Sequence, residues 1–379
     1  MNPRFGRVEY EAREEKARSL MERSGLAALF VTDPSNLYYF TGLPGFCEMS
    51  FPRPAAFVLP LAGDPVLIAH EFHLGFAWDG DFREYSKVGA LPIDLAQAAF
   101  EDKGCARGQI GAELGHEQHL SISHNDFARL RAALPEAAFV DAANLLWQLR
   151  MVKSEAEIVT ISEACAMHDA IFERVFAEAR VGVTTREIER LIRHAVIDAG
   201  ADDGFAIVCI GDFEPRQAAG SSDPERVLRE GDLMWVDMGL SWHGYHTDYC
   251  RAVVGGEPSA RQREDWDKVQ QVLLECQAAA RPGLSVADLC RVQLRAAEGL
   301  GLDMSTWTAH RFGHGSGLHT TEPPSLSLDD DTVLEPGMLI HIEPGRIQDD
   351  GIYVREEMVV ITEAGCRALS HAPWELRGV

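Results

Sequence analysis

The sequence has no long uninterrupted hydrophobic run, no paired cysteine motif and no cluster of basic residues. A membrane-spanning helix needs about 20 consecutive apolar residues, and a secretory leader needs a charged start followed by an apolar core. Neither pattern is found, so we expect a cytoplasmic protein that does not enter the membrane. The eight cysteines are scattered without a C-x-x-C pair, which argues against a disulfide framework. The formal net charge of −24 disfavours binding to nucleic acid.

The chain does contain enough apolar sequence for two packed domains, because 46% of its 379 residues are hydrophobic. In its first part, apolar runs rich in β-branched residues alternate with amphipathic segments. The runs predict strands at residues 26–31, 55–59 and 65–69, and the amphipathic segments predict helices at 10–24 and 93–100. This alternation indicates a small α/β domain, which we expect to occupy residues 1–148.

The character of the sequence changes near residue 149, where helix-start signals become frequent. Ser154 and Thr184 each stand three residues before a glutamate, which is the spacing of a capping box, and an apolar stripe follows each of them. Further helices are predicted near 265–280 and 286–298, and strands at 205–210, 233–238, 249–254, 339–342 and 358–361. We therefore expect residues 149–379 to form a second domain with helices on a mainly antiparallel sheet, and the fold to be of the α+β class.

Two aspartates flank a candidate hairpin in this second domain. If the chain turns at Trp242-His243, Asp237 lies directly opposite Asp248, with the two side chains about 5 Å apart on one face. Like charges so placed repel each other, so the pair needs a proton or a cation between them. A longer loop would shift this register.

A second candidate hairpin repeats the arrangement with glutamates. A turn at Asp349-Asp350 places Glu343 opposite Glu356. Glu357 then points to the other face, and we assign it to packing or a salt bridge. Two acidic pairs in one domain are harder to explain as solvated surface than one pair.

The four carboxylates and the glycine-flanked His314 form a ligand set that suits two hard or borderline divalent cations. An acidic hairpin at an exposed edge would have polar neighbours. The residues beside these carboxylates are apolar instead, which favours buried acids that need compensation: Val236, Met238, Ile340 and Ile342.

These motifs resemble the pita-bread metallohydrolases, the family of methionine aminopeptidase, aminopeptidase P, prolidase and creatinase. The resemblance covers five short motifs in order, namely Asp-Met-Gly at Asp237, Thr-Asp at Asp248, Gly-His-Gly at His314, Ile-Glu-Pro-Gly at Glu343 and Arg-Glu-Glu at Glu356. Upstream, residues 36–42 resemble a signature of the N-terminal creatinase/prolidase domain, and 149–155 the entry into the catalytic domain. The resemblance thus implies a pita-bread catalytic domain after a smaller creatinase/prolidase-type α/β domain.

The resemblance also implies a chemistry. Asp237 would bind one metal ion, His314 and Glu343 the other, and Asp248 and Glu356 would bridge the two ions, which could be Mn, Co, Fe or Zn. A hydroxide held between the ions would attack an amide carbonyl, with Glu343 as proton shuttle. The implied activity is that of an Xaa-Pro dipeptidase or aminopeptidase acting on small peptides as a homodimer.

Two substrate-side histidines of the peptidase pattern are missing or displaced. Thr321 stands in the place of one, and His319 lies two positions earlier. The other has no counterpart, although Arg216 or Gln217 occupies its neighbourhood. We name His319 and Arg216 as candidate catalytic residues beside Glu343, and these departures weaken the implied proline specificity.

Other hypotheses remain open. The Thr-Glu-Pro at Thr321 resembles a lyase branch that acts on dimethylsulfoniopropionate, and a hydrolase of a small non-peptide amide is a further alternative. A catalytically silent scaffold is disfavoured because all five ligand types are present. Arg251 and Arg311 could bind a substrate carboxylate, although arginine more often supports a neighbouring acid, and Phe46, Trp78 and Trp235 could line a pocket, although such aromatics usually belong to the core. His243 and His246 could support metal ligands or contact the substrate, and His341, which alternates with Glu343 on one strand face, could support a metal ligand.

Overall fold

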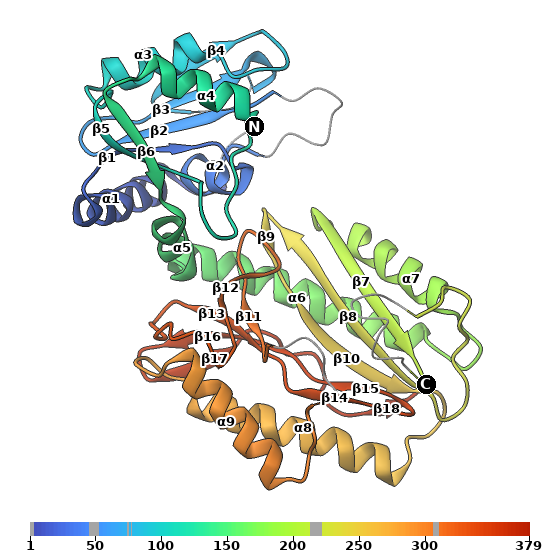
Figure 1. Ribbon diagram of the computed structural model, residues 1–379. Coiled ribbons are helices and arrows are strands. Elements are labelled where there is room, and N and C mark those ends of the chain that lie inside the picture. Colours follow the sequence, from blue (N-terminus) through green and yellow to red (C-terminus); the bar gives the residue numbers. More distant parts are fainter. Residues whose placement is uncertain (1–3, 45–52, 74–75, 77, 213–221, 306–310) are drawn as a thin grey trace. The chain divides into compact units, whose positions relative to one another are not determined.

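The computed structural model describes residues 4–44, 53–73, 76, 78–212, 222–305 and 311–379. The chain divides into two compact units, Met1–Arg150 and Met151–Val379 (Figure 1). The boundary that we expected from the sequence, after residue 148, lies in the same helix as this division, α5 (Ala143–Met151). Each unit is described below by itself.

The first unit is built around a six-stranded sheet with the order β4-β3-β2-β1-β5-β6. The pairs β1·β5, β5·β6 and β3·β4 are parallel and the others antiparallel, as expected for an α/β domain. Its elements are α1 (Arg7–Ser24), β1 (Leu26–Val31), α2 (Pro34–Thr41), β2 (Ala56–Pro60), β3 (Val66–His70), η1 (Glu71–His73), β4 (Asp81–Tyr85), α3 (Ile93–Asp102), β5 (Gly108–Ala112), α4 (His124–Ala133) and β6 (Ala137–Asp141).

The 36–42 signature belongs to α2 and is held by a buried glutamate. Glu113, directly after β5, accepts hydrogen bonds from the main-chain N–H groups of Thr32 and Asp33 and from Nδ2 of Asn36. Asn36 Oδ1 in turn accepts a bond of 2.9 Å from Arg150. The signature therefore fixes the start of α2 against the end of the unit's last helix.

The second unit contains two antiparallel sheets and a separate ribbon. The first sheet has the order β18-β10-β8-β7 with β9 attached to β8, the second has the order β12-β11-β13-β16-β17, and β14 pairs with β15. Only β10·β18 is a parallel pair among the described strands of this unit. The strands are β7 (Asp203–Ile210), β8 (Leu233–Trp242), β9 (Tyr245–His246), β10 (Tyr249–Val254), β11 (His314–Gly315), β12 (Glu322–Ser325), β13 (Leu339–Ile342), β14 (Gly345–Gln348), β15 (Gly351–Val354), β16 (Glu357–Thr362), β17 (Gly365–Ala368) and β18 (Arg377–Gly378).

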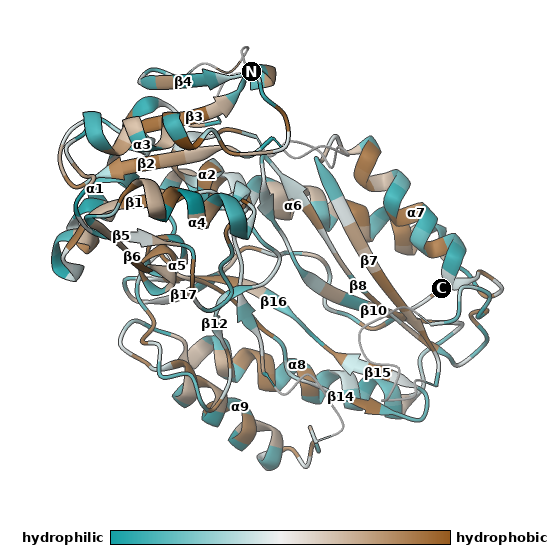
Figure 2. Cartoon of the chain, turned by 45° about the horizontal axis from the view of Figure 1, so that its top comes forward, coloured by the Kyte–Doolittle hydropathy of each residue, from teal (hydrophilic) through white to brown (hydrophobic). Residues whose placement is uncertain are grey.

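Four helices cover these sheets: α6 (Glu155–Glu178), α7 (Thr185–Asp198), α8 (Ala260–Ala279) and α9 (Val286–Gly299). The capping boxes predicted at Ser154 and Thr184 are confirmed. Each hydroxyl accepts a hydrogen bond from the main-chain N–H of the third helix residue, a glutamate, and the carboxylate of that glutamate accepts one from the main-chain N–H of the capping residue. Helices α6 and α7 pack on β8 and β7, and α8 packs on β13, β15 and β17. Figure 2 shows apolar and polar residues alternating along these helices, as one-sided burial requires.

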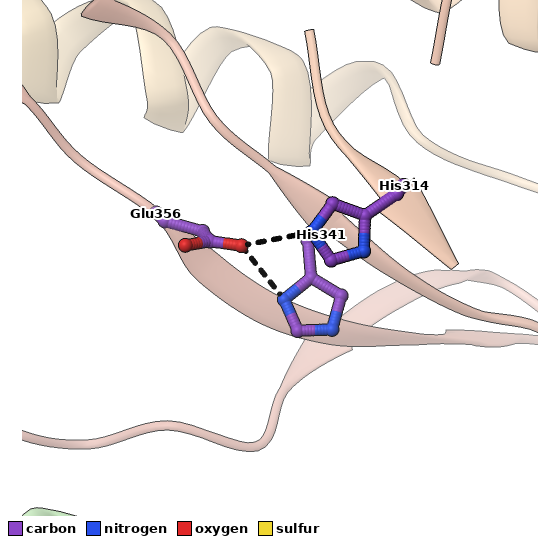
Figure 3. A group of neighbouring side chains, drawn as sticks. All are labelled: His314, His341 and Glu356. Atoms are coloured by element: carbon purple, nitrogen blue, oxygen red, sulfur yellow. Dashed lines mark ion pairs between the residues drawn. The ribbon is translucent and has the colours of Figure 1, made fainter. Parts of the chain in front are cut away.

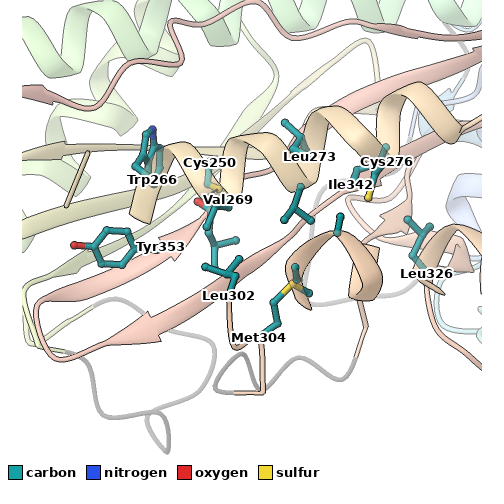
Figure 4. Close-up of a cluster of buried hydrophobic side chains, with 14 of the residues drawn as sticks. Cys250, Trp266, Val269, Leu273, Cys276, Leu302, Met304, Leu326, Ile342 and Tyr353 are labelled. Atoms are coloured by element: carbon teal, nitrogen blue, oxygen red, sulfur yellow. Dashed lines mark hydrogen bonds between the residues drawn. The ribbon is translucent and has the colours of Figure 1, made fainter. Parts of the chain in front are cut away.

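A large apolar core joins α8 and α9 to the strands that carry the acidic motifs. Trp266, Val269 and Leu273 of α8 are buried beside Ile342 of β13 and Tyr353 of β15 (Figure 4). The candidate ligand positions therefore lie on strands, or directly beside their ends, and close packing fixes the other sides of these strands.

None of the helices formed by described residues is long and apolar enough to cross a membrane. Every cysteine within the described ranges has a free thiol.

Candidate metal centre

The first predicted hairpin forms, but its register differs from our expectation. The turn lies at His243-Gly244, where both residues have positive φ (48° and 76°), the conformation of a two-residue hairpin turn that suits the twist of the strands. Asp237 consequently pairs with Cys250 and not with Asp248. The expectation that Asp237 lies directly opposite Asp248 is therefore wrong by two residues.

The two aspartates nevertheless share a face of the sheet. A shift of two residues preserves the side to which a strand residue points, so Asp248 is a diagonal neighbour of Asp237. One oxygen of each aspartate lies within 4.8 Å of the other and of an oxygen of Glu356. The prediction that the two carboxylates share one face is therefore confirmed, although the predicted pairing is wrong.

A break in the strand brings Asp248 close to β8. Asp248 lies between β9 and β10, and the preceding Thr247 uses its Oγ1 to accept from Leu240 N and to contact Nδ1 of His168 at 2.9 Å. Gly239 makes the approach possible, because a Cβ atom there would lie 2.1 Å from the carbonyl oxygen of Thr247. The close approach of the Gly239 and Thr247 backbones therefore sets the position of Asp248.

The second predicted hairpin forms with the expected register. Gln348 pairs with Gly351 at the tip, and Ile342 pairs with Glu357 farther along, so one register runs through β14·β15 and β13·β16. Between these two ladders it places Glu343 opposite Glu356, as predicted. The turn at Asp349-Asp350 is thus confirmed.

Residues from both acidic ribbons and from β11 converge in the second unit. Nε2 of His314 lies 3.5 Å from Oδ2 of Asp248. It also lies 3.5 Å from Oε1 of Glu356, a contact that Figure 3 shows. Nδ1 of His341 lies 3.0 Å from the same Glu356 oxygen. Two groups of closely spaced ligand atoms result, Asp237/Asp248/Glu356 and His314/His341/Glu356, and Glu356 belongs to both.

Burial dominates the electrostatics of these acids. It raises the pKa of Asp248 to about 7 and that of Glu343 to about 8, against opposing effects of Asp237 and His314, respectively. Burial, followed by repulsion from neighbouring carboxylates, also raises the pKa of Asp237 and of Glu356 well above the usual range. Without a cation, the site therefore retains protons on carboxyl groups at neutral pH.

The histidines are shifted in the opposite direction. Burial lowers the pKa of His314, although the charge of Glu343 partly offsets the effect. Burial and the neighbouring His314 lower the pKa of His341 well below its ordinary value. Both imidazoles are therefore neutral at physiological pH, which is the form that binds metal or accepts a proton.

The residues fit divalent cations. Within the described part of the chain, the buried atoms Asp237 Oδ1, Asp248 Oδ1 and Glu356 Oε1 have no hydrogen-bond partner. A buried carboxylate oxygen without a partner is costly, and cations between the carboxylates would remove both that cost and the mutual repulsion. Oxygen donors with an imidazole match the preferences of Mn²⁺, Fe²⁺, Co²⁺ and Zn²⁺.

Glu357 and Arg251 stand apart from this group. Glu357 points to the other face, as predicted, and its Oε1 lies 2.8 Å from Nη2 of Arg251. Arg251 is buried and also donates to the main-chain oxygens of Ala372 and Glu356. Of the two functions considered for Arg251, the structure shows the support of a neighbouring acid.

The remaining candidates lie on the 316–322 segment or next to it. The main-chain N–H of His319 donates to Glu322 Oε1 at 3.0 Å, and the adjacent Thr320 lies 3.3 Å from Nδ1 of His246. Arg311 lies 3.5 Å from Oγ1 of Thr321, and its charge lowers the pKa of Asp248, Glu343 and Glu356.

The other residues named from the sequence lie in the core, in the first unit, at the hairpin turn or outside the described residues. Trp235 is buried, with its Nε1 bonded to Val354 O, so it belongs to the core. Trp78 is partly buried in the first unit, and His243 occupies the hairpin turn. Arg216, Gln217 and Phe46 lie outside the described residues.

Sequence reasoning missed the residues that contact the proposed ligands or the strand segments that carry them. Gly239 could have been noticed as the glycine of the Asp-Met-Gly motif. Ser316, which contacts His341, and His168 of α6 carry no local signal, because their partners are distant in the sequence.

Comparison with known proteins shows similarity along the whole chain. Residues 160–363 match the family model described as Metallopeptidase family M24, and residues 13–152 match the Creatinase/Prolidase N-terminal domain. The chain is 30% identical to the probable dipeptidase PepE of Mycobacterium tuberculosis, covering 98% of this chain and 97% of that protein. It is 27% identical to the Xaa-Pro dipeptidase of Pyrococcus furiosus (96% and 99% covered). The solved X-Pro aminopeptidase of Thermotoga maritima superposes with a TM-score of 0.82 at 25% identity (95% and 100% covered).

Proposed function

The chain belongs to metallopeptidase family M24 and is a metallohydrolase of the pita-bread fold, and on this premise we propose that it uses two divalent metal ions to cleave small peptides with proline after the scissile bond. The observation that carries the proposal is the convergence of Asp237, Asp248 and Glu356, whose buried oxygens lack hydrogen-bond partners in the described part of the chain. Oxygens of three carboxylates within 4.8 Å of one another repel each other unless protons or cations lie between them.

We assign the ligands as follows. Asp237 would hold one ion, and His314 and Glu343 would hold the other. Asp248 and Glu356 would serve both ions, since Glu356 belongs to both groups of ligand atoms and His314 Nε2 lies 3.5 Å from an oxygen of each of these two residues. The ions, of Mn, Co, Fe or Zn, would polarise the scissile carbonyl and lower the pKa of water in the site.

Glu343 is proposed to move the proton. A general acid-base group must lie within hydrogen-bond reach of the proton that it moves, and the strand register places Glu343 directly opposite Glu356, another proposed ligand. The main-chain N–H of Glu343 is fixed by a 3.0 Å bond to Phe312 O, which limits where the side chain can move. Glu343 would take a proton from the attacking water and return it to the leaving nitrogen.

The substrate class rests on the relatives. The Pyrococcus protein is an Xaa-Pro dipeptidase and the Thermotoga protein an X-Pro aminopeptidase. We propose His319 and Arg216 as residues that contact the substrate, because they lie in or near the segments where this chain departs from the peptidase pattern. We further propose that the protein acts in the cytoplasm, as its free thiols suit a reducing compartment, and that it is a homodimer.

A substrate panel tests this proposal. Metal-free protein is reloaded separately with Mn²⁺, Co²⁺, Fe²⁺ or Zn²⁺ and incubated with Xaa-Pro dipeptides, matched Xaa-Ala dipeptides and longer Xaa-Pro peptides. We expect released proline or a shortened peptide, and faster turnover of Xaa-Pro than of Xaa-Ala. Preferential cleavage of Xaa-Ala would contradict the proline specificity. Release of dimethyl sulfide from dimethylsulfoniopropionate with all peptides intact would support the lyase alternative. Light scattering of the same sample tests the dimer.

A further inference from the structure

His341 of β13 contacts several groups of the candidate centre. Its side chain is fully buried (0% exposed) and lies two residues before Glu343 on the same strand face. It contacts the ring of His314, the carboxylate of Glu356 and the hydroxyl of Ser316. These contacts concern groups that the proposed function makes metal ligands, so the inference below rests on that proposal.

The contact with His314 is a stack. The ring centroids of His314 and His341 are 4.4 Å apart and the planes are inclined by only 18° (Figure 3). The strands that carry the two rings are also in close contact, because a Cβ atom at Gly313 would lie 1.9 Å from the carbonyl oxygen of His341. The His314 ring therefore cannot tilt toward β13 without displacing His341.

The two nitrogens of His341 have different neighbours. Nε2 lies 2.8 Å from Ser316 Oγ, and Nδ1 lies 3.0 Å from Glu356 Oε1. If the serine hydroxyl donates to Nε2, the neutral ring carries its proton on Nδ1 and directs it toward the glutamate. The Nδ1 contact is close but not aligned as a hydrogen bond, so a small rotation of the Glu356 carboxylate would complete it.

The stacking also distinguishes two possible functions of His341. An imidazole nitrogen binds a cation along the lone pair in its ring plane, at about 2.0–2.1 Å for zinc. Two nearly parallel, stacked rings direct their lone pairs into separate planes. A cation bound in the plane of His314 would thus lie far outside the plane of His341, and this geometry disfavours His341 as a ligand of the same ion.

We propose that His341 is a positioning residue of the metal centre: it supports the His314 ring by stacking and orients the bridging carboxylate of Glu356 through Nδ1, while Ser316 fixes its own ring. Partners of this kind fix the orientation of metal ligands, and removing one typically weakens metal binding by about 10- to 100-fold. His341 thereby couples two ligands that belong to different motifs of the sequence.

Metal titrations of His341→Phe test this function. Phenylalanine keeps a flat ring against His314 but removes both nitrogens, so Glu356 loses its partner. Metal-free variant and wild-type protein are titrated with Mn²⁺ and Co²⁺, and the dissociation constants, the number of ions at saturation and the visible spectrum of bound Co²⁺ are measured. We expect dissociation constants raised about 10- to 100-fold, with the wild-type number of ions at saturation. Ser316→Ala should give a smaller change of the same sign.

His70→Phe is the matched control. His70 is a buried histidine of the first unit that packs against Phe72 and Tyr85 and bonds to Ser86 O, so its replacement removes a comparable set of contacts far along the chain from any proposed ligand. It should leave the dissociation constants unchanged. Circular dichroism shows whether each variant folds, and His341→Leu, which also removes both nitrogens, carries the same test where His341→Phe does not fold.

The outcomes are distinct. Metal affinity equal to that of wild type or of His70→Phe would overturn the proposal. Loss of one whole ion at every metal concentration would also overturn it, because that result identifies His341 as a ligand. If wild-type protein bound no divalent ion, that result would contradict the proposed function itself. If wild-type protein bound the ions tightly and the His341 variant bound them equally well, only the inference about His341 would be contradicted.

Discussion

At the scale of single residues, this site depends on acids that are kept away from water. Asp237, Asp248, Glu343 and Glu356 would each be ionised in water at neutral pH, but burial raises the pKa of all four. Protons and cations therefore compete for the same oxygens. This competition leads to two predictions.

Asp248→Asn should separate stability from function. The substitution removes one buried charge, so we expect the metal-free protein to be at least as stable as wild type. It also removes a proposed bridging oxygen, so activity should fall by more than the roughly 100-fold that loss of an outer partner costs, and the metal content should drop. Thermal unfolding, elemental analysis and peptidase assays measure these effects. Asp349→Asn, at an exposed turn residue, is the control and should change none of them. An active variant with two metal ions would contradict the bridging assignment.

The metal-free protein should become less stable as the pH rises. The folded-state pKa values of Asp248 and Glu343, about 7 and about 8, lie above their unfolded values of 3.8 and 4.5. The folded state therefore holds protons that the unfolded chain has released, and their stabilising contribution is lost as the pH rises through 7 and 8.

Thermal unfolding between about pH 5.5 and 8.5 measures this loss. Saturating Mn²⁺ should raise the unfolding temperature more at the upper end of that range. The carboxyl groups have lost their protons there, so the ions do not have to compete with protons for the oxygens. Asp248→Asn should show a shallower dependence on pH. A metal-free unfolding temperature that rises steadily toward pH 8.5 would contradict the assignment.

At the scale of the elements, the site depends on interruptions in regular strands. The β9–β10 strand breaks at Thr247-Asp248, and the β13–β14 strand breaks at Glu343-Pro344. Each interruption carries one of the proposed ligands, Asp248 at the first and Glu343 at the second. At the first interruption, Gly239 on the opposite strand lets the two backbones approach closely.

Gly239→Ala tests this at the first break. The new Cβ would lie 2.1 Å from the Thr247 carbonyl oxygen, so the segment before Asp248 must move away from β8. We expect a loss of about 1–3 kcal/mol in unfolding free energy, as for an overpacked core, and weaker metal binding. Gly299→Ala, near the end of α9, is the control because no atom lies within 4 Å of its Cβ position. Equal metal affinity in both variants would show that the close contact at Gly239 does not position Asp248.

At the scale of the whole molecule, the proposed ligands all belong to one of the two compact units. Met151–Val379 contains all five of them and its own apolar core of strands, α8 and α9. The first unit has a separate core around its six-stranded sheet. Each unit therefore has the means to fold alone.

We predict that residues 151–379, expressed alone, fold and bind divalent metal. The measurements are a cooperative thermal transition and elemental analysis after dialysis, with the Asp248→Asn form of the same fragment as control. A folded fragment without metal would mean that the first unit is required to form the site.

Much of the fold could be predicted from local sequence. The strands at residues 26–31, 249–254 and 339–342 and both capping boxes were placed correctly, because each depends on neighbouring residues. The register of the Glu343–Glu356 ribbon was also correct, since its turn lies at the predicted Asp349-Asp350 and the pairing then follows by counting. Hydrophobic alternation fixed which face each carboxylate occupies.

The rest required the tertiary structure. The first hairpin turns one residue later than predicted, because the left-handed conformations of His243 and Gly244 are not specified by a pattern of apolar and polar residues. The stacking of His341 on His314 joins positions 27 residues apart on different strands. Sequence alone determined which side chains we propose to carry the chemistry, since residue type and spacing set charge and direction. Only packing between distant strands and helices decided their distances, because a separation of a few ångströms depends on the close approach of backbones that no single segment encodes.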